Sequence, residues 1–283
     1  MATQAGVVVQ VGFAFTNYNN SDLSEALVKS VTPLLNDGRA RVVFVDNASR
    51  PAEVEKMRRI EQTYPGVSVI YNPENSGYFK GLNIGIRALR TGDDVPELVV
   101  VGNNDLEFPA DFARQLERAE NVMQRFPVVC PDLVGLDGEH QNPHVSRPIT
   151  PLRRLVWRLY FSNYLLAQVI AAASRVSRRL TQRTDHHLHQ EAGPIIEGYG
   201  ACYVLTPMFF RSYSELWAPT FLMGEEFFLA KQIEQIGQQI YYEPSIVVQH
   251  LDHATTGEVP SRKMWEISRE SHRVYREYLE RYG

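Results

Sequence analysis

Short apolar runs alternate with segments of helical periodicity along the first half of the chain. The runs are rich in β-branched and aromatic residues and predict four buried strands, at 7–16, 41–46, 67–71 and 98–101. Apolar positions that recur every three or four residues predict the helices that follow them, at 22–35, 51–64, 80–89 and 109–126. This order predicts an α/β fold with a mostly parallel central sheet that helices cover on both faces.

The second half of the chain is less regular. It predicts a strand at 199–205, a helix at 225–236 and a strand at 239–248. Residues 262–282 predict a C-terminal helix, which we assign to packing or to a homodimer surface rather than to chemistry. An arginine-rich segment with helical periodicity lies between the two halves.

Polar residues cluster where each of the first four predicted strands ends. The clusters are Thr16–Asn17, Asp46–Asn47, the segment from Asn72 onward, and Asn103–Asn104–Asp105. In an open α/β sheet, ligands bind outside the carboxyl ends of the strands. We therefore expect all four clusters to border one crevice.

Composition and missing motifs exclude several classes of protein. The net charge of −4 argues against a chain that grips nucleic acid through overall positive charge. Neither GxGxxG nor GxxxxGK[ST] is present, which argues against dehydrogenases and P-loop NTPases. Cys130 and Cys202 lie far apart, so a disulfide framework or zinc finger is not expected. Without an evident secretory leader or an apolar run of membrane-spanning length, we expect a cytoplasmic protein.

Two of the polar segments have residue types suited to a nucleotide. Asp46 can accept a hydrogen bond from the imide N–H of uracil or thymine, although a turn that ends the strand is an equally ordinary use of aspartate. The segment 72–86 contains three glycines spaced by four residues and two amides, Asn75 and Asn83. Glycine allows close approach to a ligand, and the alternative is a loop that enters a helix with ordinary packing.

Carboxylates and one histidine are candidates for a metal site and for acid–base chemistry. Asp105 follows a buried strand, where one carboxylate and a diphosphate suffice for Mg²⁺ or Mn²⁺; helix capping is the alternative. Glu225 and Glu226 begin a helix, as acidic residues often do, but their apolar flanks favour the raised basicity of a general base. His250 ends the next strand and is either structural or a nitrogen ligand to Mn²⁺.

Six ordered segments resemble family 2 glycosyltransferases, the inverting enzymes of the GT-A fold, and especially their bacterial rhamnosyltransferase-like branch. The segments are VVFVDNAS (42–49), NSGYFKGLNIGI (75–86), VVVGNND (99–105), GYGACYVLTPMFF (198–210), FLMGEEFFL (221–229) and YYEPSIVVQH (241–250). Each is weak alone, but six in the family's order cover nearly the whole chain.

The resemblance implies a role for each candidate residue. Asp46, with Thr16 and Asn17, would hold the pyrimidine of the donor. The nucleotide and diphosphate would be lined by Asn75, Gly77, Lys80, Asn83, Asn103 and Asn104. Asp105 occupies the place of the family's metal-binding DxD motif, and His250 matches a histidine that binds the metal in some members. The base would be Glu226, or its neighbour Glu225.

The function implied is the metal-dependent, inverting transfer of a hexose from a UDP- or dTDP-sugar to a lipid-linked or polysaccharide hydroxyl in a bacterial surface glycan. The chain would be one GT-A domain: a nucleotide-sugar half (1–130), an acceptor half (131–258) and a C-terminal helix (259–283). A catalytically weak or inactive nucleotide-sugar or glycan-binding protein is the alternative. It is supported by Asn103 and Glu226 where the family has aspartates, and by Leu216–Trp217–Ala218 where it has Phe-Asp-Glu.

The arginine-rich segment reveals a charge asymmetry. Residues 147–184 contain eight arginines and no acidic residue, so the remaining 245 residues have a net charge of −12. Within the helical stretch 150–184, leucines share a face, and Trp157, Tyr160, Phe161 and Tyr164 are types that favour a membrane interface. Either this helix lies on an anionic membrane as a peripheral contact, or it packs on the domain with its arginines in water.

Overall fold

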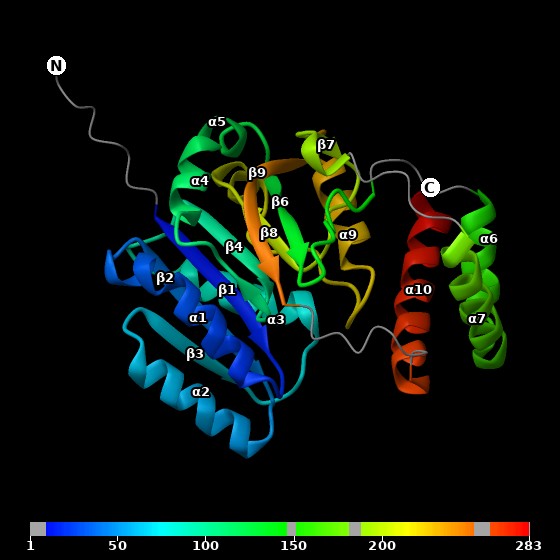
Figure 1. The fold of residues 1–283 in the computed structure, drawn as a ribbon, viewed down its shortest axis with the longest axis horizontal. Helices are drawn as coiled ribbons and strands as arrows, with labels where there is room; N and C mark the ends of the chain where they lie inside the picture. The colour runs from blue at the N-terminus through cyan, green and yellow to red at the C-terminus, as the bar shows by residue number, and fades with distance from the viewer. Residues whose placement is uncertain (1–9, 146–150, 181–187, 252–260, 283) are drawn as a thin grey trace.

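A nine-stranded sheet forms the centre of the molecule, with helices on both faces (Figure 1). The structure is a computed structural model that describes residues 10–145, 151–180, 188–251 and 261–282, with the backbone alone for 174–180. The strands follow the order β3-β2-β1-β4-β8-β6-β9-β5, and β7 pairs with β9. The predicted α/β architecture is thus confirmed.

The parallel part of the sheet comes from the first half of the chain. It consists of β1 (Val11–Asn17), β2 (Ala40–Asn47), β3 (Val67–Asn72) and β4 (Leu98–Asn103). These strands pair only in parallel with one another, as their continuous apolar runs predicted. Residues 7–9 of the first predicted strand lie outside the described residues.

The second half of the chain adds a mixed sheet. Its strands are β5 (Leu106–Glu107), β6 (Val128–Gly135), β7 (Gly193–Ile195), β8 (Cys202–Leu205) and β9 (Ile240–His250). β8 is antiparallel to both β4 and β6, whereas β6 and β9 are parallel. The amino end of β8 therefore lies at the same edge as the carboxyl ends of β4, β6 and β9.

Strands β5, β6 and β7 were not predicted. Pro131 interrupts the apolar run of β6 and argues against a central strand, but the register shifts between Pro131 and Asp132, and this irregularity accommodates the missing N–H. The predicted helix 109–126 is divided into α4 (Phe112–Arg118) and α5 (Glu120–Met123), because the backbone of Ala119 between them is not helical (φ −90°, ψ 12°).

Two apolar cores lie on opposite faces of the sheet. One packs alternate strand residues against α1 (Ser21–Asn36), α2 (Pro51–Thr63), α4 and α5. The other packs the opposite strand positions against α3 (Tyr78–Leu89), α8 (Pro207–Ser212) and α9 (Glu225–Glu234). This alternation is the period of two expected of strands that are covered on both faces.

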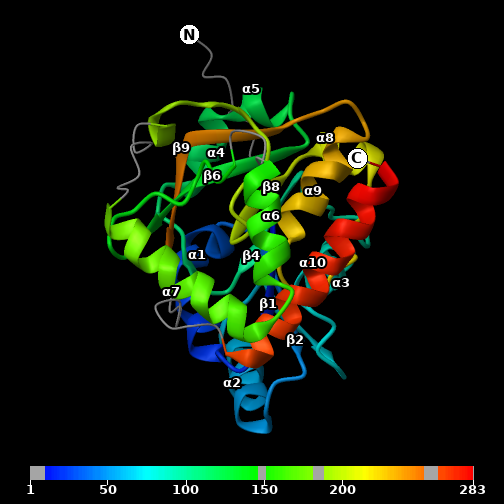
Figure 2. The same cartoon turned by 90° about the vertical axis from the view of Figure 1, so that its right-hand side faces the viewer.

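A third layer of helices lies outside α9, in front of the sheet in Figure 2. It consists of α6 (Pro151–Tyr160), α7 (Tyr164–Leu180) and α10 (Arg262–Tyr282). Two of the aromatic residues expected at a membrane interface pack on α10: the ring of Trp157 contacts Tyr275, and the ring of Phe161 stacks on His272. Of the predicted segment 150–184, residues 150 and 181–184 lie outside the described residues. No helix in the described ranges has both the length and the apolarity of a membrane span.

Gly102 on β4 tests the junction between the parallel and mixed parts of the sheet. A Cβ there would collide with the carbonyl oxygen of Ala201, which accepts a hydrogen bond from Asn103 N at 2.9 Å. We expect Gly102→Ala to lower the free energy of unfolding by about 1–3 kcal/mol, measured by urea denaturation. Gly193→Ala on β7 is the control, since a Cβ there meets nothing within 4 Å. Equal unfolding midpoints for the two variants would contradict this account.

Candidate active site

The polar clusters do meet at one edge of the sheet. In the parallel register, Asn17 lies opposite Asp46, Thr16 opposite Asn103, and Asn47 opposite Asn72. The convergence predicted from the strand ends is therefore confirmed. Gly200 and Ala201, which precede β8, and His250, which ends β9, lie at the same edge because of the strand directions described above.

A buried network of side chains joins β1 to β2. Asn17 donates from Nδ2 to Oδ1 of Asp46 at 2.7 Å, and Oδ2 of Asp46 accepts from the backbone N–H of Ser49 at 3.0 Å. Asp46 is 1% exposed. It thus ends its strand in a local turn, and each carboxylate oxygen, with one hydrogen bond, keeps a further acceptor site.

Asn104 turns into the fold and braces helix α1. Its Nδ2 donates to Ser24 Oγ at 2.7 Å and to Asn20 Oδ1 at 2.9 Å, while its Oδ1 accepts from Asn20 Nδ2 at 3.0 Å. The side chain is buried, and both N–H groups of its amide are bonded within the protein. Asn104 therefore positions the loop between β4 and β5 and has no N–H left for the nucleotide contact expected of it.

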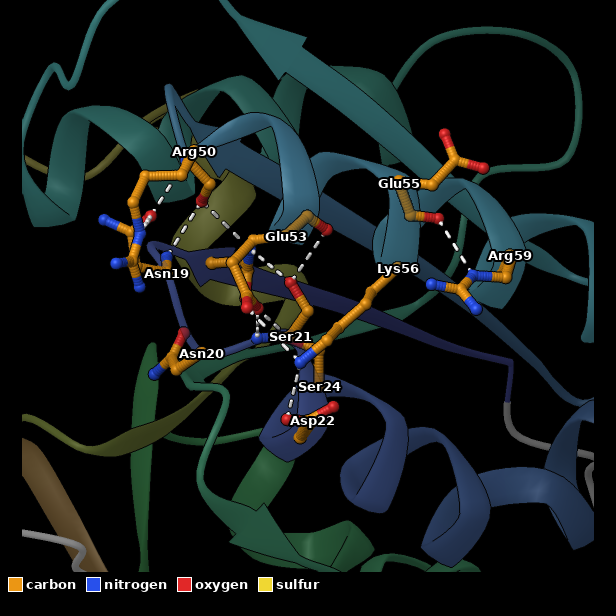
Figure 3. Close-up of polar contacts among 12 residues, drawn as sticks. Asn19, Asn20, Ser21, Asp22, Ser24, Arg50, Glu53, Glu55, Lys56 and Arg59 are labelled. Carbon is orange, nitrogen blue, oxygen red and sulfur yellow. Dashed lines mark hydrogen bonds and ion pairs between the residues drawn. The ribbon is translucent and has the colours of Figure 1, made fainter.

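The loops that follow β1 and β2 are fixed to each other by polar contacts (Figure 3). Ser21 donates from its backbone N–H to Glu53 Oε2 at 3.0 Å and from its hydroxyl to the Glu53 carbonyl at 3.1 Å. These hydrogen bonds, led by the one from the Ser21 N–H, lower the pKa of Glu53. Asn19 Oδ1 likewise accepts from the backbone N–H of Arg50 at 2.8 Å. The loops after β1 and β2 are thus held in place by contacts within the protein.

The glycine-rich segment is tied to the loop before α9. Gly77 has φ of 91°, and a Cβ there would collide with the carbonyl of Phe221, which accepts from Tyr78 N at 3.0 Å. Asn75 Oδ1 accepts from Gly77 N at 3.0 Å. Asn83 exchanges two hydrogen bonds of 2.8 Å with the backbone of Leu216, so it braces this loop and is not turned toward a ligand. Lys80 is exposed.

Asp105 and His250 form an unusual pair. Pairing of β5 with β9 places their side chains together, with Asp105 Oδ1 and His250 Nε2 3.2 Å apart. The side chain of His250 is 3% exposed and that of Asp105 18%. Within the described part of the chain, neither of these two buried atoms has a hydrogen-bond partner. An unsatisfied buried carboxylate oxygen and ring nitrogen are costly to maintain.

The tautomer of His250 indicates which kind of ligand the Asp105–His250 pair could bind. Its Nδ1 contacts Gln141 Oε1 at 2.8 Å, and because an amide oxygen only accepts, Nδ1 is the donor. In the neutral ring, Nε2 then presents a lone pair toward a lone pair of Asp105. One imidazole nitrogen and one carboxylate oxygen that converge in this way fit a divalent cation such as Mn²⁺. No group of three histidine, cysteine or acidic residues gathers among the described residues, so the other ligands would have to come from substrate and water.

The glutamate pair lies at the other side of the crevice, at the start of α9. The carboxylate of Glu226 accepts a hydrogen bond from the backbone N–H of Gly200, and a Cβ on Gly200 would collide with it. The carbonyl of Gly200 accepts from the Tyr78 hydroxyl at 2.7 Å. Burial, followed by the charges of Glu225, Glu226 and Asp105, raises the pKa of Tyr78. Tyr78 and Glu226 are thus joined through Gly200.

Burial makes these glutamates basic. It raises the pKa of Glu225 to about 8, with a further contribution from Glu226, and it also raises the pKa of Glu226. Glu225 is 4% exposed, whereas Glu226 is only partly buried. Sequence reasoning missed Glu197, whose pKa is raised to about 7 by burial and then by Glu226. A lone glutamate in an irregular segment gave no signal that could have found it.

Comparison with known proteins extends this description. A family model described as glycosyl transferase family 2 matches residues 14–175, more than half of the chain. No curated protein matches the chain in sequence.

Several solved structures share the fold. The mannosyltransferase PcManGT from Pyrobaculum calidifontis, in complex with GDP-Man and Mn²⁺, has a TM-score of 0.54 and 18% identity over 94% of this chain and 62% of its own. GalNAc-T7 with UDP, GalNAc and Mn²⁺ has a TM-score of 0.51 and 14% identity, over 86% of this chain and 44% of its own. S. aureus TarS 1–349 has a TM-score of 0.50 and 11% identity, over 86% of this chain and 61% of its own. This chain spans less than two thirds of each, and at these identities the likeness establishes the GT-A fold alone.

The buried carboxyl of Glu225 predicts a pH-dependent stability. Because its pKa is about 8 in the folded state against 4.5 ordinarily, its contribution to stability is fully present below pH 4.5 and is lost as the pH rises toward 8. Glu225→Gln removes this loss, so its melting temperature should exceed that of the wild type increasingly between pH 5 and pH 8. Exposed Glu234→Gln, on the same helix, should show no such trend. A difference independent of pH would disprove the assignment.

Proposed function

Because the chain belongs to glycosyl transferase family 2, we propose that it is a metal-dependent, inverting hexosyltransferase. It would transfer a sugar from a UDP- or dTDP-linked donor to a hydroxyl of a lipid-linked or polysaccharide acceptor in a bacterial surface glycan. The observation that carries the proposal is the Asp105–His250 pair, whose facing atoms have no hydrogen-bond partner, at the same edge of the sheet as buried Glu225 and half-buried Glu226. The rhamnosyltransferase-like branch is supported by the six ordered segments alone.

The donor would lie across the carboxyl ends of β1, β2 and β4. Asp46 retains acceptor sites for an imide N–H, next to Thr16, and the Asn17 amide fixes its orientation. Gly77 would line the diphosphate through its backbone, since the space of its missing Cβ is taken by the Phe221 carbonyl, and exposed Lys80 on the first turn of α3 would contact phosphate. Asn83 and Asn104 would act only by holding these loops, since their amides are already bonded.

The residues that would hold a cation are Asp105, through Oδ1, and His250, through Nε2. When bound, Mn²⁺ or Mg²⁺ supplies Lewis acidity that stabilises the charge developing on the leaving diphosphate. Gln141 keeps the ring of His250 in the tautomer whose Nε2 can coordinate. Two protein ligands are enough for such an ion only when a substrate completes its coordination.

Glu226 would take the proton of the acceptor hydroxyl as that oxygen attacks the sugar. It is the more accessible of the two glutamates, and the Gly200 N–H holds its carboxylate. Glu225, with a pKa of about 8, is mostly protonated at neutral pH and so adds little negative charge beside Glu226. Neighbouring carboxyl groups with different pKa values are a common arrangement in acid–base catalysis.

Replacing Glu226 tests the proposed base. Glu226→Gln should lower the rate of sugar transfer by about 10²-fold or more, while donor affinity stays near that of the wild type. Glu234→Gln on the same helix serves as control and should keep full activity. The assay follows nucleotide release and product formation with a panel of UDP- and dTDP-sugars and Mn²⁺. If the wild type binds nucleotide but turns none over, the protein is instead the binding protein considered from the sequence.

A second prediction concerns the residues that would hold the metal. Thermal shift with UDP or dTDP should give a larger increase in melting temperature when Mn²⁺ is present than without it. Asp105→Asn and His250→Gln should each remove this metal-dependent part and keep the nucleotide-dependent part. Glu107→Gln, an exposed carboxylate on β5, is the matched control. An unchanged metal effect in both site variants would contradict the assignment.

A further inference from the structure

Helix α6 has two apolar sides, of which the fold uses only one. None of its residues is buried. Its inner side packs on α10 through Trp157 and Tyr160, and Phe161, just after the helix, stacks on His272. On its outer side, residues spaced by three and four positions form a ridge that is 38–71% exposed: Leu152, Leu155, Val156 and Leu159.

The apolar surface continues on the next helix. Leu165 and Val169 of α7 are 69% and 64% exposed and lie one turn apart. Figure 2 shows α6 and α7 together as the outermost layer of this side of the molecule. A soluble protein rarely leaves so many large aliphatic side chains in one place without a partner for them.

Cationic side chains accompany this surface. A hollow of about 460 Å³ lies between α6 and α10, lined by Arg158, Arg269, Arg273 and Arg276 among others. Two glutamates, Glu266 and Glu270, also line it, so its lining remains net positive. In the described part of the chain, Arg158 forms no ion pair. Burial, followed by the charges of Arg276 and Arg158, lowers the pKa of neighbouring His272 to about 4.

The positive charge of residues 147–184 favours an anionic membrane over a second copy of the chain as the partner of this face. A second copy of the chain would bring two segments of charge +8 together if it docked through the same face. An anionic bilayer offers both an apolar interior for the leucines and negative headgroups for the arginines. We propose that the outer face of α6 and α7 docks on an anionic phospholipid membrane, with the arginines of α6 beside its headgroups.

This surface is connected to the catalytic side of the molecule. Ser271 on α10 donates to the carbonyl of Leu222 at 2.6 Å, in the loop that leads to Glu225. The ring of Tyr275 contacts Trp157 on α6. It also contacts the ring of Phe227, the residue after Glu226, with 4.5 Å between the two ring centroids. Docking would thus hold the glutamates beside the membrane. The docking itself does not depend on the proposed transfer reaction.

Flotation with vesicles tests the proposal without an activity readout. The wild type should float with vesicles of phosphatidylglycerol and phosphatidylcholine in equal amounts, and far less with phosphatidylcholine alone. Arg154→Glu with Arg158→Glu should weaken binding by about fivefold or more for each arginine replaced. Serine at Leu152, Leu155 and Leu159 should abolish it, because the ridge is then polar.

Matched control variants distinguish an effect of this surface from an effect of net charge or of losing any exposed leucine. Arg58→Glu with Arg59→Glu changes the net charge equally on exposed positions of α2, and Leu136→Ser removes a leucine that is 63% exposed elsewhere. Both should bind as the wild type does, and melting temperatures establish that all variants fold. Equal flotation of the α6 variants and the wild type would overturn the proposal. A dimer that the same leucine variants dissociate, without vesicle binding, would assign the face to a second copy instead.

Discussion

The pairing of antiparallel β8 with β4 is the constraint on which the site depends. Close approach at Gly102 lets the Ala201 carbonyl meet the backbone of Asn103, and this fixes Gly200 at the crevice. Gly200 then receives the hydroxyl of Tyr78 on one side and holds the carboxylate of Glu226 on the other. Tyr78 and Glu226 are therefore linked through the loop before one short strand, although they are more than a hundred residues apart in sequence.

The sequence predicts the first half of the fold well and the second half less so. The strands from β1 to β4 are continuous apolar runs, whose burial on both faces leaves a clear pattern. β6 contains Pro131, and β7 has only three residues, so neither has a local signal strong enough to compete with a loop. Their existence depends on partners distant in sequence, above all on β9, which pairs with both.

For the candidate site, sequence identifies residue types but not what each side chain contacts. Asn83, Asn104 and Asp105 are equally polar and all belong to the expected motifs, yet both amides are bonded inside the fold. Asp105 keeps an unsatisfied buried oxygen. Satisfied groups brace loops, whereas a buried polar atom without a partner is costly unless something else compensates it. This distinction needs three-dimensional contacts, which periodicity and spacing do not contain.

The same reasoning applies to apolar surface. Trp157, Tyr160 and Phe161 are residue types suited to a membrane interface, but they are used within the helical layer, where α10 covers them. Aliphatic Leu152, Leu155 and Leu159 remain uncovered beside arginines. A helix with no buried residue gains little from the fold on its outer side, so exposed leucines there are a cost without a partner. Since α10 connects this helix to the loop before Glu225, a membrane that covered these leucines would also lie at a set distance from the two glutamates.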